Sequence, residues 1–311
     1  MPDIVVMFFL LGLVAGVLRS DLTIPKAAYD TLSLLLMLTI GLKGGMALHG
    51  AIQWSLVIEL LAVAAIGAVI PLLVLPLLRL LGVNLSDSAS LAAHYGSVSA
   101  GTFAVVLAYA ETNGLSHGAQ TTLYLVMLEL PAIIVALALY RRFSSDTKTA
   151  SRIELWHETL TNRGVVLLTG GVLIGWMYGP SEGAGVTELF TGAFKAVLAL
   201  FLLEMGLTAA ETLRPIPWKQ WRLLVFAIIA PMVLAMFGIL VGMQMGLETG
   251  SLLILSTLVA SASYIAAPAA VRTAIPTADI GLAMLLSLGL TFPFNVMVGI
   301  PLYHSIIEAL I

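Results

Sequence analysis

Residues 94–105 read HYGSVSAGTFAV, and this stretch lies inside a long apolar segment. Between Gly96 and Thr102 it carries three hydroxyl groups and two glycines. Glycine disfavours a helix interior, and each hydroxyl needs a hydrogen-bond partner away from water. A helix of this composition is therefore either packed tightly against its neighbours or interrupted, and the choice between the two decides the fold.

The composition is that of a membrane protein. The chain has 311 residues, of which 60% are hydrophobic and 10% charged, whereas about a quarter of a soluble domain is charged. Its apolar runs are long and continuous and do not alternate, so they predict an all-α helix bundle and not a barrel. The chain has no cysteine, which excludes disulfides and thiol chemistry. We expect no nucleic-acid partner and no cofactor.

Ten hydrophobic segments are predicted to span the bilayer. They cover residues 3–19, 28–48, 54–80, 87–110, 119–140, 163–179, 187–210, 219–245, 250–272 and 280–307. The first has no basic region before it and no clear cleavage site, so we interpret it as a retained span. The long polar connection is residues 141–162.

The basic residues give the predicted orientation. With ten spans, twelve of the fourteen Lys and Arg residues fall on one side: Arg19, Lys26, Arg79, Arg141, Arg142, Lys148, Arg152, Arg163, Arg214, Lys219, Arg222 and Arg272. The other two, Lys43 and Lys195, lie within spans. The positive-inside tendency makes the basic side cytoplasmic, so both termini are expected outside.

The two halves of the chain repeat each other. Five short matches occur in the same order at offsets of 159 to 167 residues: GLVAGV with GVLIGW, LTIGLK with LEMGLT, WSLV with WRLLV, SVSAGTFA with SASYIAAP, and LPAIIV with FPFNVM. Residues 1–140 and 163–311 then each hold five spans, joined by a cytoplasmic linker at 141–162. Since five is odd, the second half enters from the opposite side. The prediction is a 5+5 inverted repeat, as in many secondary transporters.

The fourth span of each half carries a small, hydroxyl-rich centre, GSVSAGT in one and SASYIAAP in the other. Paired interrupted spans indicate a substrate site, although close helix packing through small residues is the alternative. An interrupted helix offers free backbone amides and a positive dipole end to an anion. For single hydroxyls, a bond to a carbonyl of the same helix is the simpler interpretation. The candidate substrate-binding residues are Gly96, Ser97, Ser99, Gly101, Thr102, Ser261, Ser263 and Tyr264.

Ionisable residues within spans are functional candidates. Glu129 precedes Pro131, which frees carbonyl oxygens one turn back, so we assign ion coupling to Glu129 with Ser263 and Thr102. No metal is expected other than sodium. Lys43 and Glu204 fall almost opposite each other in the repeat, which predicts one buried ion pair between the halves.

The stretches IGLKGGMAL, GSVSAGTFAV, LELPAIIVA and SASYIAAPAAVRTAIP, in this order, resemble the sodium-dependent bicarbonate transporter superfamily. The resemblance implies ten spans in an inverted repeat, broken and crossing fourth and ninth spans, and homotrimers. It also implies a permease for sodium-coupled bicarbonate uptake across the bacterial inner membrane. Cyanobacterial members have a longer central cytosolic loop and bind a PII-like regulatory protein, whereas the loop of this chain is short. They also carry an Asp where this chain has Tyr264, so we expect weaker sodium dependence, or proton dependence, through Glu129.

Three other functions are alternatives to transport of a small anion. An organic carboxylate substrate, as in the bile-acid-type sodium symporters, would need a large apolar cavity, whereas a tight hydroxyl-lined cavity would favour bicarbonate. An intramembrane enzyme is not expected, because the GSVSAG stretch places a serine near glycines without the G-x-S-x-G spacing, and no H-E-x-x-H occurs in the sequence. A receptor or channel would lack the saturable, ion-dependent flux of a coupled transporter.

Overall fold

The structure is a computed structural model that describes residues 4–50, 53–144, 161, 163–214 and 217–311. Most of the predicted linker, at residues 145–160 and 162, lies outside the described residues. The described chain folds into helices joined by short connections, and no β-strand occurs in it. This is the all-α fold that the continuous apolar runs predict.

The helices follow the predicted apolar segments. In chain order they are α1 (Ile4–Leu18), α2 (Lys26–Leu48), α3 (Trp54–Leu80), α4 (Leu85–Gly96), α5 (Ala100–Thr112), α6 (Thr121–Phe143), α8 (Arg163–Glu182), α9 (Ala184–Thr212), η1 (Trp218–Gln220), α10 (Trp221–Gln244), α11 (Thr249–Val259), α12 (Ala266–Ala274), α13 (Ile280–Met284), η2 (Leu285–Thr291), α14 (Phe292–Phe294), η3 (Asn295–Gly299) and α15 (Ile300–Leu310). The last five form one continuous stretch, in which η2 and η3 are π-helical.

Eight helical stretches among the described residues are long and apolar enough to cross a membrane. Two shorter apolar helices, α1 and α11, fall on the first and ninth predicted spans. A helix of about 20 residues matches the hydrocarbon thickness, so this chain is a multi-pass membrane protein. Residues 85–112 count as one such stretch although α4 and α5 are separate helices.

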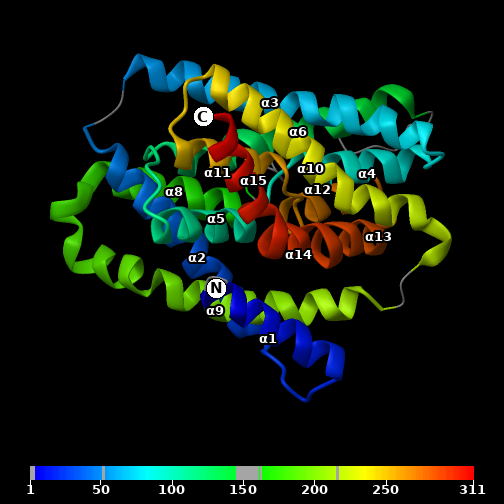
Figure 1. Cartoon of the computed structure of the whole chain (residues 1–311), viewed down its shortest axis with the longest axis horizontal. Coiled ribbons are helices and arrows are strands. Elements are labelled where there is room, and N and C mark those ends of the chain that lie inside the picture. Colours follow the sequence, from blue (N-terminus) through cyan, green and yellow to red (C-terminus); the bar gives the residue numbers. More distant parts are fainter. Residues whose placement is uncertain (1–3, 51–52, 145–160, 162, 215–216) are drawn as a thin grey trace.

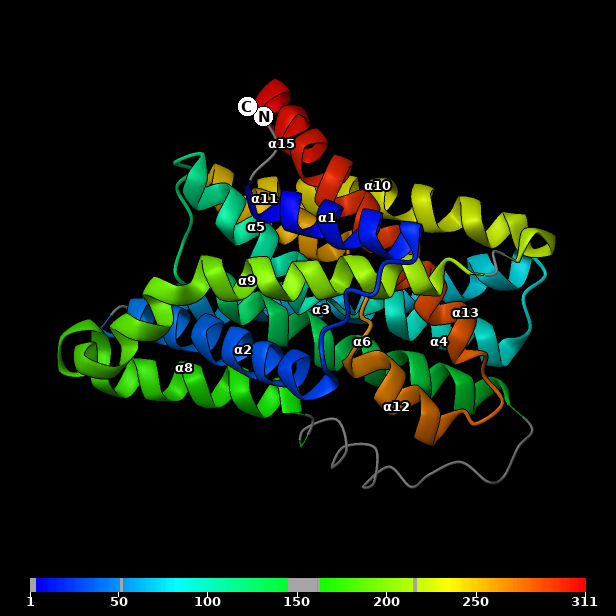
Figure 2. The same ribbon diagram turned by 90° about the horizontal axis from the view of Figure 1, so that it is seen from below.

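Several connections between the long helices lie at the two ends of the molecule's long axis, which is horizontal in Figures 1 and 2. The α2–α3, α5–α6 and α8–α9 connections lie at one end, on the left. The α3–α4 and α9–α10 connections lie at the other, on the right. The long helices therefore run between two faces, as membrane spans do. We call the left face the α5 end, because α5 terminates there.

The helices pack in two groups. The four-helix layer consists of α1, α2, α8 and α9, in which α1 lies against α9 and α2 against α8. The α2–α8 contact depends on small residues: a β carbon added at Gly41 would lie 2.5 Å from the carbonyl oxygen of Leu168. The main bundle holds α3 to α6 and α10 to α15. Each group takes helices from both predicted halves, so residues 1–140 and 163–311 interleave in space.

Candidate functional site

Both hydroxyl-rich stretches are interrupted, and they touch. Residues 97–99 separate α4 from α5, and residues 260–265 separate α11 from α12. The amide of Ser263 donates to the carbonyl oxygen of His94 at 2.8 Å, and the amide of Ser99 donates to Oγ of Ser261 at 3.0 Å. These bonds satisfy backbone groups that the interruptions free, in a region buried from solvent. Of the two alternatives left by the sequence, the helix is broken.

Serine hydroxyls begin the second helix of each broken pair. Ser99 is the N-cap of α5: its Oγ accepts from the amide of Thr102 at 3.0 Å and from the Thr102 hydroxyl at 2.9 Å. In α12, Oγ of Ser263 accepts from the amide of Ala267 at 3.2 Å. Pro268 follows within the first turn, where its missing N–H costs no helical hydrogen bond.

The start of α5 and the start of α12 therefore meet at one place. The first amides of a helix have no partner within that helix, and they carry the positive end of its dipole. At Ala100 and Ala266 two such ends come together beside Ser99 and Ser263. Converging helix N-termini form an anion-binding arrangement without any cationic side chain.

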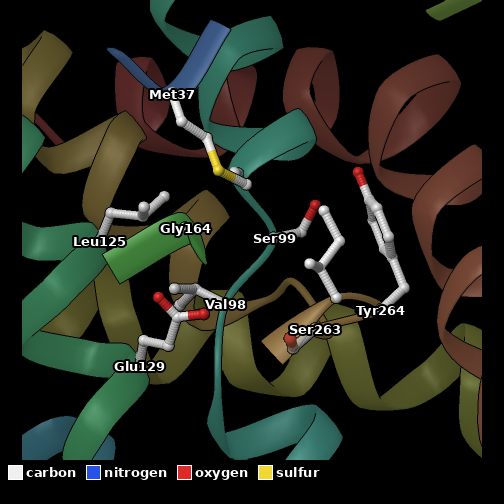
Figure 3. Close-up of a pocket in the computed structure, with 10 residues that line it drawn as sticks. Met37, Val98, Ser99, Leu125, Glu129, Gly164, Ser263 and Tyr264 are labelled. Atoms are coloured by element: carbon white, nitrogen blue, oxygen red, sulfur yellow. The ribbon is translucent and has the colours of Figure 1, made fainter. Parts of the chain in front are cut away.

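A small cavity lies at this junction (Figure 3). Its volume is about 20 Å³, and it is lined by Met37, Val98, Ser99, Ala100, Leu125, Glu129, Gly164, Ser263, Tyr264 and Ile265. One water needs about 10–15 Å³ by this measure, so the cavity as it stands holds one water-sized species. Glu129 and Ser263 come from the two predicted halves, and the fold brings them to the same space.

Glu129 is the acidic group of the cavity. It lies on α6 with only 9% of its surface exposed. None of the three ion pairs found in the described part of the chain includes it, and no described residue donates a hydrogen bond to it. A charged carboxylate away from water is costly unless it is paired. Glu129 therefore needs a proton or a bound cation.

Tyr264 turns its hydroxyl away from Glu129. In Figure 3 the two side chains lie on opposite sides of the connection that carries Val98 and Ser99. The Tyr264 ring packs edge-on against Phe292, with centroids 5.5 Å apart. Its hydroxyl lies against Gly101, where a β carbon would collide with it. A tyrosine at this position thus fills space beside α5 and brings no negative charge to the cavity.

The remaining candidates lie around the cavity and do not line it. Thr102 and Ser261 are buried and bond to other parts of the junction. Ser97 is buried at the end of α4, and its hydroxyl has no partner among the described residues. The space beside Gly96 is filled, since a β carbon there would lie 2.6 Å from Cγ of Pro71. Packing accounts for this glycine, and its contact with a substrate stays a prediction.

The predicted pair of Lys43 with Glu204 is wrong. Lys43 Nζ lies 2.5 Å from Oε1 of Glu111 and 4.6 Å from the centre of the Phe194 ring, whereas Glu204 accepts from Thr208 on its own helix at 3.4 Å. The directions of the two helices explain the difference. Lys43 is near the end of α2 and Glu204 near the end of α9, and these helices run in opposite directions. The two charges therefore lie toward opposite ends of the molecule and do not pair.

Three residues of the junction were not among the residues predicted from the sequence. Met37 and Gly164 line the cavity from α2 and α8, which the repeat argument did not connect to the site. Asn295 is fully buried in η3, and its Nδ2 donates to the carbonyl oxygen of Ala260 at 2.9 Å. It satisfies a carbonyl freed by the break after α11. The sequence signal that could have identified Asn295 is its position as a lone asparagine in an apolar span.

The Na+-dependent bicarbonate transporter superfamily matches this chain over residues 4–308, from the start of α1 into α15. No curated protein matches it.

Proposed function

The chain belongs to the Na+-dependent bicarbonate transporter superfamily, and from this premise we propose that it is a secondary transporter that takes up bicarbonate together with a cation at the junction of α4–α5 and α11–α12. Membership of a transporter family points to a protein that moves its substrate and is not an enzyme. One observation carries the assignment of the site. The starts of α5 and α12 meet beside Ser99, Ser263 and Glu129 around one cavity.

The proposed roles follow from the chemistry of bicarbonate, a small anion with acceptor oxygens and one donor. The first amides of α5 and α12 face its negative oxygens. Ser99 and Ser263 already accept hydrogen bonds from the protein, so each hydroxyl proton is free to be donated to the anion. The small side chain of Ala100, which lines the cavity, leaves room for close approach to the backbone.

The size of the cavity supports a small substrate. At about 20 Å³ it is smaller than bicarbonate and must widen slightly to admit it. A bulky organic carboxylate would need a far larger opening, since pockets for drug-sized molecules measure about 300–1,000 Å³. At this junction the size of the cavity therefore favours bicarbonate over an organic carboxylate.

Coupling follows from charge. Two unit negative charges about 6 Å apart repel by about 3 kcal/mol at an effective dielectric near 20, which is a factor of roughly 100 in affinity. Bicarbonate beside an ionised Glu129 meets such a penalty, and a sodium ion or a proton on Glu129 removes it. Anion binding then requires a cation. Because Tyr264 adds no charge, Glu129 and neutral oxygens alone hold the sodium ion. The dependence of uptake on sodium is therefore weaker than with an Asp at residue 264, or is replaced by a dependence on protons.

We also propose the arrangement in the membrane. The two interrupted stretches are the crossing fourth and ninth spans of a 5+5 inverted repeat, and the basic face holding Arg79 and Arg214 is cytoplasmic. Both termini then lie outside a bacterial inner membrane. Assembly as a homotrimer stays a prediction of the family resemblance. So does a PII-like regulator, whose expected linker lies outside the described residues.

Uptake of labelled bicarbonate into proteoliposomes tests the proposal. The account expects saturable uptake that an inward sodium or proton gradient accelerates, and competition by small anions. Uptake that does not saturate and ignores both gradients would assign the protein to a channel. Competition by bulky organic carboxylates alone would move the substrate to that class.

A further inference from the structure

Two lysines reach the end of α5 from the four-helix layer. Lys43 on α2 pairs with Glu111, with Nζ 2.5 Å from Oε1. Lys195 on α9 donates to Oγ1 of Thr112 at 3.1 Å. Both acceptors are at the last turn of α5, in the main bundle, so each contact joins one helix group to the other.

These contacts are unusual in this fold. Three ion pairs were found in the described part of the chain, and only Lys43–Glu111 crosses between the two groups. Arg163–Asp30 joins α8 to α2 within the layer, and His304–Glu308 lies within α15. Together with the Lys195–Thr112 hydrogen bond, the Lys43–Glu111 pair connects the layer to the bundle through polar groups at the α5 end.

The surroundings of Lys43 favour a contact that can open and close. The Lys43 and Glu111 side chains are 26% and 29% exposed, so water reaches the pair. A partly exposed pair contributes little free energy and can separate, whereas a fully buried one holds its partners strongly. The Phe194 ring, 4.6 Å from Nζ, supports the ammonium from the layer side and keeps it in place when the pair is broken.

The pair is far from the cavity along the same helix. Helix α5 begins at Ala100, which lines the cavity, and Glu111 is eleven residues further on. At about 1.5 Å per residue this is roughly 16 Å. The pair thus lies between the cavity and the α5 end of the molecule, across the boundary that must open for a ligand to enter from that end.

We propose that the Lys43–Glu111 pair, with Lys195–Thr112 beside it, closes the transport path at the α5 end, and that Lys43, once released, is the first charge met by an incoming anion. The inference rests on the proposed function. An exposed cation at the entrance attracts anions and raises their association rate. Each cycle then breaks the pair when the cavity faces that end and restores it when the cavity faces the other.

The test measures access to the cavity and does not require transport. The chain has no cysteine, so a Val98→Cys variant has one thiol, at the cavity. Its labelling rate by a membrane-impermeant thiol reagent added at the α5 end is compared with and without Lys43→Gln or Glu111→Gln. Either substitution should raise the rate about fivefold, the equivalent of about 1 kcal/mol for a partly exposed pair. The exchanged pair Lys43→Glu/Glu111→Lys should return the rate to the starting value.

Three outcomes would overturn the inference. The first is an unchanged labelling rate in both single variants. The second is a raised rate that the charge exchange does not reverse, which would indicate lost packing. The third outcome concerns two variants with paired cysteines, each joined by a short bifunctional thiol reagent. Joining the cysteines of Lys43→Cys/Glu111→Cys should stop uptake reversibly. Joining those of the control Asp30→Cys/Arg163→Cys, which lie within the layer, should not. Uptake that continues with the first pair joined contradicts the closure. Because labelling requires no substrate, it stays informative if the protein does not carry bicarbonate.

Discussion

The amide of Ser263 donates a hydrogen bond to the carbonyl oxygen of His94, 2.8 Å away, and so fastens the second interrupted stretch to the end of α4. The same residue uses its side chain to cap α12 through the amide of Ala267. One serine thus holds the junction with its backbone and supplies a hydroxyl to the cavity. Substitution of the side chain separates these two roles, because the backbone bond remains.

Ser263→Ala should weaken anion binding about tenfold, as expected for the loss of one hydrogen bond to a charged group. The measurement is the half-saturating bicarbonate concentration for uptake. Ser287→Ala is the matched control, because Ser287 is equally buried but bonds only to Ala283 on its own helix. Equal effects of the two substitutions would show that Ser263 has no special relation to the substrate.

The packing of Gly101 against Tyr264 gives a stability prediction. A β carbon at residue 101 collides with the Tyr264 hydroxyl, while Phe201 and Phe292 stay at 3.1 and 3.3 Å. Gly101→Ala should destabilise the protein by about 1–3 kcal/mol, the usual cost of overpacking. Adding Tyr264→Phe removes the colliding oxygen and should recover most of the loss in thermal unfolding in detergent. Destabilisation that persists in the double variant would mean that the collision is with another group.

The sequence predicts much of this fold for physical reasons. Apolar runs of spanning length fix where the helices lie, because a backbone in lipid must satisfy its own hydrogen bonds. Glycines and hydroxyls at 96–102, and hydroxyls at 261–268, mark the two breaks, because such residues weaken a helix. Both signals are local in the chain and are visible without any knowledge of packing.

Contacts between distant helices could not be predicted in this way. The Lys43–Glu111 pair depends on the depth at which each charge lies, and similarity between the halves gave the wrong partner for Lys43. Met37 and Gly164 reach the cavity only because the four-helix layer packs against the main bundle. Apolar sequences contain little information about which helix faces which, so these positions required the structure.

The orientation is tested by single cysteines in the cysteine-free chain. Glu248→Cys lies in the α10–α11 connection and Lys219→Cys near the start of α10, and both positions are exposed. An impermeant thiol reagent added to intact cells should label the first and should label the second only after the membrane is opened. Labelling of both from outside, or the reverse pattern, would contradict the assignment of the basic face to the cytoplasm.

Tyr264→Asp should strengthen sodium dependence, because it places a carboxylate among the neutral oxygens of the junction. The expected result is a sodium concentration for half-maximal uptake about tenfold lower than in the wild type, since hydrogen-bonded or ion-paired charged groups contribute about 1.5–3 kcal/mol. Tyr264→Asn is the control, because it removes the same ring without adding charge. If the Asn variant gains as much sodium dependence as the Asp variant, the missing charge is not what weakens coupling.

The most direct measurement of the central claim is bicarbonate uptake by wild-type and Glu129→Gln proteoliposomes under an inward sodium gradient, an inward proton gradient and no gradient, at alkaline pH where little CO2 can leak through. Glu59→Gln serves as control, because the Glu59 carboxylate already accepts hydrogen bonds from Gln120 and Tyr124. The account predicts that at least one gradient accelerates uptake in the wild type and the control, and that neither does so in Glu129→Gln, which still folds. A Glu129→Gln protein that responds to the gradients as the wild type does would contradict the claim that Glu129 couples the cation to the anion.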